Sequence, residues 1–267
     1  MRIYFSTTNL MYGLREAILE TNVRNLLFSY YYKTSNFNDW FQLIKELNKP
    51  NVMIDSGAFS AWTGKKKIDR QSYLEFIYEC KEKFGPITND LHFVNLDVIP
   101  GEFGRKPTDL EIEESAKLGW ENFEWFKSKG VDVIHVFHQH EDFKWLEKLM
   151  KASDYIGISP ANDLSTSQRL PWLKKCFSIV RTRCKTHCFG GTSKEILLSV
   201  PFYSADSSSY AISRKFSPRF NRMKVPRGVH NRDIVPIIKK RIKEEIVKKQ
   251  QLEDLATKVW KLRGIDL

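Results

Sequence analysis

The sequence predicts an α/β fold in which eight short apolar strands alternate with helices. Two observations favour it. Nearly every apolar run is followed by a stretch with helical apolar spacing, and the separations suit parallel strands joined by crossover helices. A (β/α)8, or TIM, barrel is the natural closed form of this pattern, and 267 residues suit one such core. An open doubly wound sheet is the alternative, but no Gly-x-Gly-x-x-Gly follows the first strand.

The first half of the chain supplies four strand–helix pairs. Trp40, Leu43 and Ile44 share one face of an expected amphipathic helix. Thr108 and Glu111 match the Thr-x-x-Glu capping box that begins a helix. The strands are expected at 2–6, 26–31, 52–54 and 92–96, and the helices at 11–21, 37–47, 70–84 and 108–130.

The second half continues the alternation and ends in a basic extension. The whole chain, 1–267, is expected to form a single domain, with a basic loop over 213–232 and C-terminal helices over 233–267. The remaining strands are expected at 133–137, 155–158, 186–189 and 202–205, and the helices between them at 142–152, 170–183 and 194–200.

The composition is globular and strongly basic, with 42% hydrophobic residues and a formal net charge of +11. This charge favours a nucleic-acid partner over a membrane surface, because it is not confined to one amphipathic helix. A soluble basic protein without such a partner is the alternative.

No apolar run reaches the roughly 18 residues that span a bilayer, and the first residues lack a secretion signal. With four cysteines, which fit a reducing compartment, a cytoplasmic location is expected.

Three carboxylates occupy the same position on three expected strands. Asp55, Asp97 and Asp206 each come where an apolar run ends. Because all strands of a parallel barrel end at one rim, where active sites lie, these carboxylates predict one shared site. The alternative for Asp206 is an Asp that begins a Ser-rich turn. Further residues expected at this rim are His138 or Gln139, Ser159, Gly190 and Gly191.

No metal or other cofactor is expected at this rim. His187 and Cys188 would point to opposite faces of a strand, and so would His135 and His138. Several carboxylates without a metal, on a basic protein, indicate chemistry at a glycosidic bond. In such chemistry one carboxylate attacks C1′ of a sugar while a second group handles the departing base.

Two segments make this indication specific. Asp55-Ser56-Gly57-Ala58-Phe59 resembles the Asp-Ser-Gly-Gly-aromatic motif of the tRNA-guanine transglycosylase family. The segment from Asp206 to Tyr210 resembles the one that carries the nucleophile in the archaeal members of that family. The likeness covers about residues 55 to 210, and the other rim residues follow the family's order between the two segments.

The resemblance implies a role for each rim residue. Asp206 would be the nucleophile that captures C1′ as guanine leaves, and Asp55 the general acid/base. Asp97 would accept hydrogen bonds from N1 and the 2-amino group of guanine, as an ionised carboxylate can. Phe59 would stack on a base that has left its helix, and Gln139 with the glycine turn would contact O6. The implied substrate-binding residues are Asp97, Gln139, Phe59, Gly190, Gly191 and Ser56.

Departures from the tRNA enzymes favour the DNA-modifying branch of this family. No Cys follows Cys188, so the sequence lacks the Cys/His zinc site that the tRNA enzymes carry after the nucleophile. Ala58 stands in place of the second Gly of the first motif, and Ser60 in place of the Gln after the aromatic residue. The compact, zinc-free, basic chain is similar to enzymes that exchange guanine in DNA for a 7-deazaguanine, such as a preQ0-type compound.

The basic loop is expected to bind a nucleic-acid backbone, because residues 207–232 contain no Asp or Glu. A solvated loop is the alternative. For the whole protein the alternatives are the same exchange on tRNA, an inactive nucleic-acid-binding barrel, and an unrelated barrel enzyme. A homodimer or accessory modification proteins are possible partners. The expected backbone contacts are Arg214, Lys215, Arg219 and Arg222.

Overall fold

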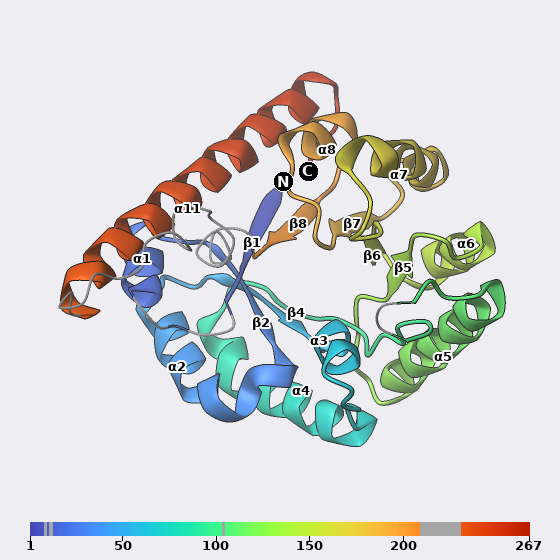
Figure 1. Cartoon of the computed structure of the whole chain (residues 1–267), viewed down its shortest axis with the longest axis horizontal. Helices are drawn as coiled ribbons and strands as arrows, with labels where there is room; N and C mark the ends of the chain where they lie inside the picture. Colours follow the sequence, from blue (N-terminus) through green and yellow to red (C-terminus); the bar gives the residue numbers. More distant parts are fainter. Residues whose placement is uncertain (8–9, 11–12, 103–104, 209–230) are drawn as a thin grey trace.

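Eight parallel strands form one curled sheet with helices around it (Figure 1). The computed structural model describes residues 1–7, 10, 13–102, 105–208 and 231–267. The sheet order is β4-β3-β2-β1-β8-β7-β6-β5, which is the order of a barrel opened between β4 and β5. A parallel bridge between Val94 and Ile134 joins that seam, through Ile134 N–H to Phe93 O over 2.8 Å and Asn95 N–H to Ile134 O over 2.9 Å. The predicted barrel is therefore confirmed.

In the first half, the predictions at 2–6 and 70–84 match the observed bounds, and the capping box of Thr108 and Glu111 is present. The short helix α3 and two 3-10 helices, η1 and η2, were not predicted. The elements are β1 (Arg2–Ser6), α1 (Leu14–Glu20), β2 (Asn25–Ser29), η1 (Tyr30–Tyr32), α2 (Lys33–Glu46), β3 (Asn51–Asp55), α3 (Ala58–Thr63), α4 (Arg70–Phe84), η2 (Gly85–Ile87), β4 (Leu91–Phe93) and α5 (Asp109–Ser128).

In the second half, the order of elements is as predicted but several bounds differ. Helix α7 begins earlier than the predicted 170, because Ser165 and Gln168 form a capping box. One continuous helix, α11, stands where separate C-terminal helices were predicted. The elements are β5 (Val136–His138), α6 (Phe143–Ala152), β6 (Tyr155–Ser159), α7 (Thr166–Val180), β7 (Lys185–Cys188), α8 (Lys194–Ser199), β8 (Ser204–Ser207) and α11 (Asn231–Leu262).

The last strand is shifted along the chain relative to the prediction of 202–205. Ser204 to Ser207 pair with β1, with Asp206 opposite Tyr4. The apolar Phe202 is fully buried but precedes the strand. Asp206 therefore lies inside β8, where it pairs with Tyr4 of β1, and not in the turn after the strand.

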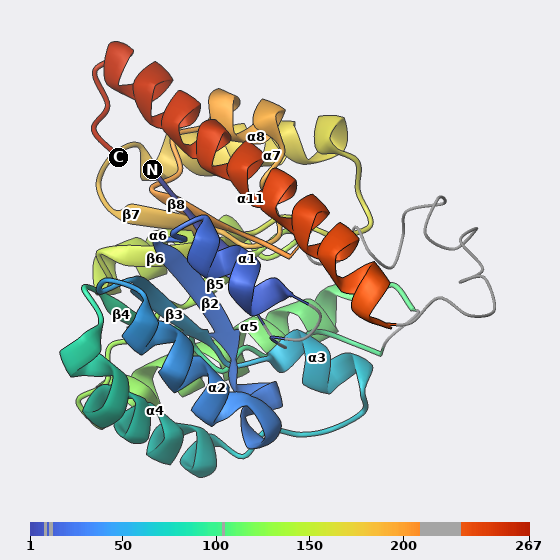
Figure 2. The same cartoon turned by 90° about the vertical axis from the view of Figure 1, so that its left-hand side faces the viewer.

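Apolar side chains fill both the inside of the barrel and the layer between strands and helices. The larger cluster joins the outer strand faces to the helices, and α11 packs on α1 and α8 to close it (Figure 2). The two termini meet, because the Met1 ammonium group donates to Leu267 O over 3.2 Å. None of the described helices combines the length and apolar character needed to cross a bilayer. The inner cluster consists of Tyr4, Leu27, Met53, Val94, Ile134, Val136 and Tyr155.

Candidate active site

Asp55 and Asp206 lie close enough, at the carboxyl ends of their strands, for the charge of Asp206 to act on the Asp55 carboxyl group. Asp55 ends β3, and Asp206 is in β8. The carboxyl group of Asp55 is closely surrounded by protein atoms, although the residue as a whole is only half-buried at the rim. Burial, and then the negative charge of Asp206, raise the pKa of Asp55 to about 6. A carboxyl group with this pKa can both give and take a proton near neutral pH.

A glycine turn holds the Asp55 carboxylate in place. Gly57 donates its backbone N–H to Asp55 Oδ2 over 3.1 Å. Gly57 has φ 78°, and a Cβ there would lie 2.5 Å from Tyr31 Cβ and 2.6 Å from Ser29 Oγ. A side chain is therefore excluded by both conformation and space. The turn leads into α3, which carries Phe59.

The two other residues of the first motif differ in exposure. Ser56 is buried, with 1% of its surface accessible, whereas Phe59 is 50% exposed. The Phe59 ring lies against Trp62, with 5.8 Å between the ring centroids. Phe59 thus presents an exposed ring on α3, the helix that follows Asp55 in the chain, while Ser56 is buried in the turn between them.

One oxygen of the Asp206 carboxylate is anchored. The backbone N–H of Gly190 donates to Asp206 Oδ1 over 2.9 Å, and Nε2 of His187 lies 3.6 Å from the same oxygen. Gly190 adopts φ 69°, the left-handed conformation that suits glycine. Within the described part of the chain, no hydrogen bond reaches the other oxygen, Oδ2. The Asp206 side chain keeps 16% exposure.

Asp97 faces a chain of buried titratable groups. His138 Nε2 lies 3.5 Å from Asp97 Oδ2, and His138 Nδ1 lies 3.2 Å from Glu141 Oε1. Burial raises the pKa of Glu141 to about 8 and lowers the pKa of His138 to about 4. The pKa of Asp97 is raised well above its usual range by burial and by Asp55 and Glu141. Burial therefore favours the uncharged forms of Asp97, His138 and Glu141 in the empty site.

Gln139 is oriented as a hydrogen-bond donor. Its Oε1 accepts the backbone N–H of Ala161 over 3.0 Å, which directs the NH2 group away from that contact. The glycine turn offers less than the sequence suggested. The Gly190 N–H already donates to Asp206, and the Gly191 N–H faces the Cys188 thiol. Among the predicted O6 contacts in the described structure, Gln139 carries the more available donor.

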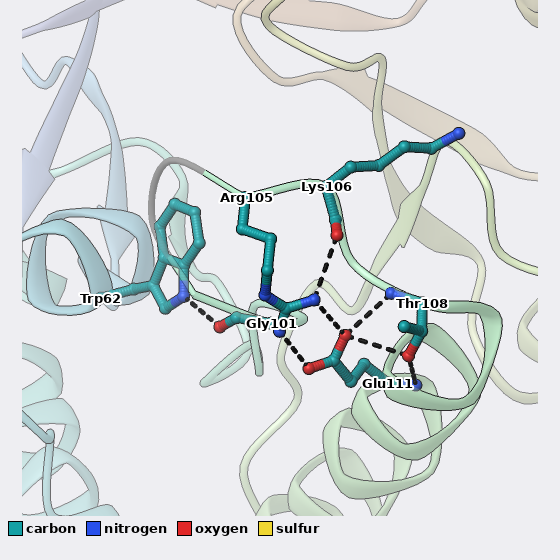
Figure 3. A network of polar contacts seen from close by, with 6 residues as sticks. All are labelled: Trp62, Gly101, Arg105, Lys106, Thr108 and Glu111. Atoms are coloured by element: carbon teal, nitrogen blue, oxygen red, sulfur yellow. Dashed lines mark hydrogen bonds and ion pairs between the residues drawn. The ribbon is translucent and has the colours of Figure 1, made fainter.

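A network of polar contacts fastens the segment after Asp97 to the neighbouring helices (Figure 3). Trp62 donates its indole N–H to Gly101 O over 2.9 Å. Arg105 forms a two-point pair with Glu111, over 2.5 and 3.1 Å, and Glu111 also accepts the backbone N–H of Thr108 over 2.8 Å. The Arg105 guanidinium and these donors lower the pKa of Glu111. The network ties the segment that carries Asp97 to α3 and to the start of α5.

The proposed nucleic-acid contacts Arg214, Lys215, Arg219 and Arg222 lie outside the described residues. In the described ranges, no group of three or more His, Cys, Asp or Glu side chains is arranged to hold a metal ion.

Sequence reasoning missed the two groups that face the predicted carboxylates. His187 and Glu141 were not assigned to the site, because their role depends on which strands and turns are neighbours in space.

Comparison with known proteins supports the fold. No protein-family model matches the chain, and no curated protein is similar to it in sequence. Among solved structures, the X-ray structure of the YdjI aldolase from Escherichia coli K12 is similar, with a TM-score of 0.54 over 94% of this chain and 90% of that chain. The two sequences are 14% identical, a level that shows a shared fold alone. The chain is thus an α/β protein of the TIM-barrel type, with a carboxylate-rich rim.

Proposed function

We propose that this protein is a base-exchange transglycosylase that replaces guanine in DNA with a 7-deazaguanine base. The observation that carries the proposal is the pair of Asp55 and Asp206 at one rim, where the charge of one raises the pKa of the other. A base-exchange reaction needs two carboxyl groups in different roles at one sugar–base bond. In such pairs the surroundings typically raise the pKa of the group that acts as the acid.

In the first half-reaction, Asp206 attacks C1′ of the deoxyribose. The bond from Asp206 to C1′ forms as the C1′–N9 bond breaks. The electron pair of the C1′–N9 bond leaves with guanine. Protonated Asp55 gives its proton to the departing base, which leaves as neutral guanine. Oδ2 of Asp206, to which none of the described residues donates, suits the attack, because Oδ1 is engaged by the Gly190 N–H.

In the second half-reaction, the incoming 7-deazaguanine gives its N9 proton to Asp55 and attacks C1′. The bond from C1′ to Asp206 breaks, and its electrons return to the carboxylate. Two displacements at one carbon restore the original configuration of the sugar. Asp55 ends protonated, ready for the next departing guanine, and a pKa of about 6 suits this exchange of roles.

Asp97, Gln139 and Phe59 are the proposed base-binding residues. A guanine presents N1–H and 2-amino donors, which match the carboxylate of Asp97. Its O6 acceptor matches the NH2 group of Gln139, whose Oε1 accepts the Ala161 N–H. Phe59 offers an exposed ring for stacking. Guanine and a 7-deazaguanine share these edges, so one pocket can take both bases in turn.

DNA is the proposed polymer because of the basic charge and the lack of a zinc-site signature. The net charge of +11 favours a polyanion, and tRNA remains the competing substrate. The test is incubation of the protein with labelled guanine and either duplex DNA, single-stranded DNA or tRNA. We expect label in DNA. Label in tRNA alone would replace DNA by tRNA in the proposal, and label in neither polymer would contradict the exchange activity.

A further inference from the structure

A chain of buried polar groups leads from Asp206 into the barrel. His187 Nε2 lies 3.6 Å from Asp206 Oδ1, and His187 Nδ1 lies 2.7 Å from Ser204 Oγ. Ser204 Oγ in turn lies 2.6 Å from the Tyr155 hydroxyl oxygen. His187 and Ser204 have no accessible surface, and Tyr155 has 7%. Three side chains from three strands therefore form one line that ends at the proposed nucleophile.

The direction of donation in this chain follows from counting donors. If Tyr155 donates to Ser204 and Ser204 donates to His187 Nδ1, then the proton of the neutral imidazole is on Nε2 and points at Asp206. The reverse direction would place the bare lone pair of Nε2 against a carboxylate oxygen in a buried site, where it has no other partner in the described structure. Burial raises the pKa of Tyr155 well above its usual range, which keeps its donor proton in place. The first direction is therefore favoured.

The ring of His187 is held in this orientation by packing. Its centroid lies 4.4 Å from that of Phe189 and 5.8 Å from that of Tyr4. Gly157 on the neighbouring strand makes room for Phe189, because a Cβ there would lie 2.7 Å from the Phe189 ring. The pairing of His187 with Ser204 in the register of β7 and β8 fixes the contact between them. The imidazole is thus preorganised before any substrate arrives.

We propose that His187 is a positioning residue that, with Gly190, directs two donors at Asp206 Oδ1 and so leaves Oδ2 as the attacking oxygen. The present 3.6 Å separation shortens to a hydrogen bond when the carboxylate turns toward C1′. Ser204 and Tyr155 act through His187 by fixing its tautomer. This inference rests on the proposed function, since it assigns the partner of the nucleophile in that reaction.

The test compares variants of His187 that keep or lose the Nε2 donor. His187→Gln places an amide NH2 near the position of Nε2, whereas His187→Phe keeps a ring and has no donor. We expect His187→Phe to slow single-turnover formation of the covalent DNA adduct by roughly 10- to 100-fold, the loss of one hydrogen bond to a charged group, with the Kd for DNA changed less than about twofold. His187→Gln should recover most of the rate, and Ser204→Ala should lose part of it.

His92→Phe is the matched control. His92 is a half-buried histidine on β4, and the centroid of its ring lies 5.1 Å from that of Tyr155. The His92→Phe variant should form the adduct at the wild-type rate. Equal rates for wild type, His187→Phe and His187→Gln would overturn the proposal while leaving the proposed function intact.

A second measurement does not depend on activity. Nitrogen chemical shifts of the His187 imidazole in the free wild-type protein should report the Nε2–H tautomer. The Nδ1–H tautomer would overturn the proposal by itself. If the wild-type protein forms no adduct, the proposed exchange activity is contradicted. The role of Asp206 as the nucleophile positioned by His187 is then contradicted as well.

Discussion

Trp62 donates its indole N–H to the carbonyl oxygen of Gly101 over 2.9 Å, and this bond joins two segments that serve the candidate site. Trp62 belongs to α3, which carries Phe59, and Gly101 lies in the segment that follows Asp97. The aromatic face and the carboxylate proposed to hold the base thus come from parts of the chain that are tied directly to each other (Figure 3).

Loss of this tie should weaken binding of the base more than it slows chemistry. Trp62→Phe keeps an aromatic ring but removes the donor, so we expect KM for the free base to rise several-fold with kcat nearly unchanged. The unfolding free energy should fall by about 1 kcal/mol, the contribution of one hydrogen bond. Trp260→Phe is the matched control, because it removes an indole bond to Leu197 O between α11 and α8. The idea fails if both variants change KM equally.

The two half-reactions should respond to pH in opposite directions. Release of guanine needs protonated Asp55, so its single-turnover rate should fall as pH rises through about 6. Discharge of the isolated adduct by an incoming base needs ionised Asp55, so that rate should fall as pH drops through the same value. Rapid-quench measurements on each half-reaction between pH 5 and pH 8 provide the check. Parallel profiles for both steps would exclude Asp55 as the shared acid and base.

Binding of guanine should release a proton from Asp97. The pKa of Asp97 is raised well above its usual range in the empty site, whereas acceptance of the N1–H and 2-amino donors requires the ionised carboxylate. Affinity for free guanine should therefore rise with pH, by up to about tenfold per pH unit. Asp97→Asn should bind weakly and lose this dependence, and the exposed Asp132→Asn should retain it. Calorimetry in two buffers of different ionisation enthalpy would show no proton release if Asp97 were already ionised.

Glu141 should make the fold less stable as pH rises. The folded protein keeps a proton on Glu141 up to about pH 8, whereas the unfolded chain releases it near the ordinary Glu pKa of about 4.3. The folded state therefore binds more protons across this window, and its stability falls with increasing pH. Glu141→Gln removes this loss, so above pH 8 the variant should be more stable than wild type by a few kcal/mol, at about 1.4 kcal/mol per pKa unit.

Thermal unfolding at pH 5 and at pH 9 measures this difference. Glu111→Gln is the control of opposite sign, because Arg105 lowers the pKa of Glu111. That variant should be slightly less stable than wild type at neutral pH, with the difference shrinking as pH falls toward the low pKa of Glu111. A difference between Glu141→Gln and wild type that does not change with pH would show that Glu141 is ionised in the folded protein.

The sequence was sufficient for the order of the eight strands and of the longer helices, because local signals decide it. The capping box at Thr108 marks the start of α5, and the alternation of apolar runs and amphipathic stretches marks the rest. It failed where pairing decides. Phe202 is apolar and buried but stands before β8, since hydrogen bonds with β1 begin at Ser204. Helix α2 begins at Lys33, because a turn of Tyr30–Tyr32 leads into it.

For the site, sequence position was enough to bring the carboxylates to one rim but not to give their environment. Asp55 and Asp206 are far apart in sequence and meet only because β3 and β8 end on the same side of the sheet. Glu141 lies in an ordinary-looking turn, and only the folded structure shows its contact with His138 and the burial that raises its pKa to about 8. The availability of the Gly190 and Gly191 N–H groups likewise depended on contacts with Asp206 and Cys188.

The most direct measurement is the identity of the residue that carries the DNA during exchange. Wild-type protein is incubated with guanine-containing DNA without free base, quenched by denaturation, digested and analysed by peptide mass spectrometry. We predict a deoxyribose-linked adduct on the peptide that contains Asp206, and none with Asp206→Asn, which should still bind DNA. An adduct on a peptide without Asp206, or wild-type exchange by Asp206→Asn, would contradict the account.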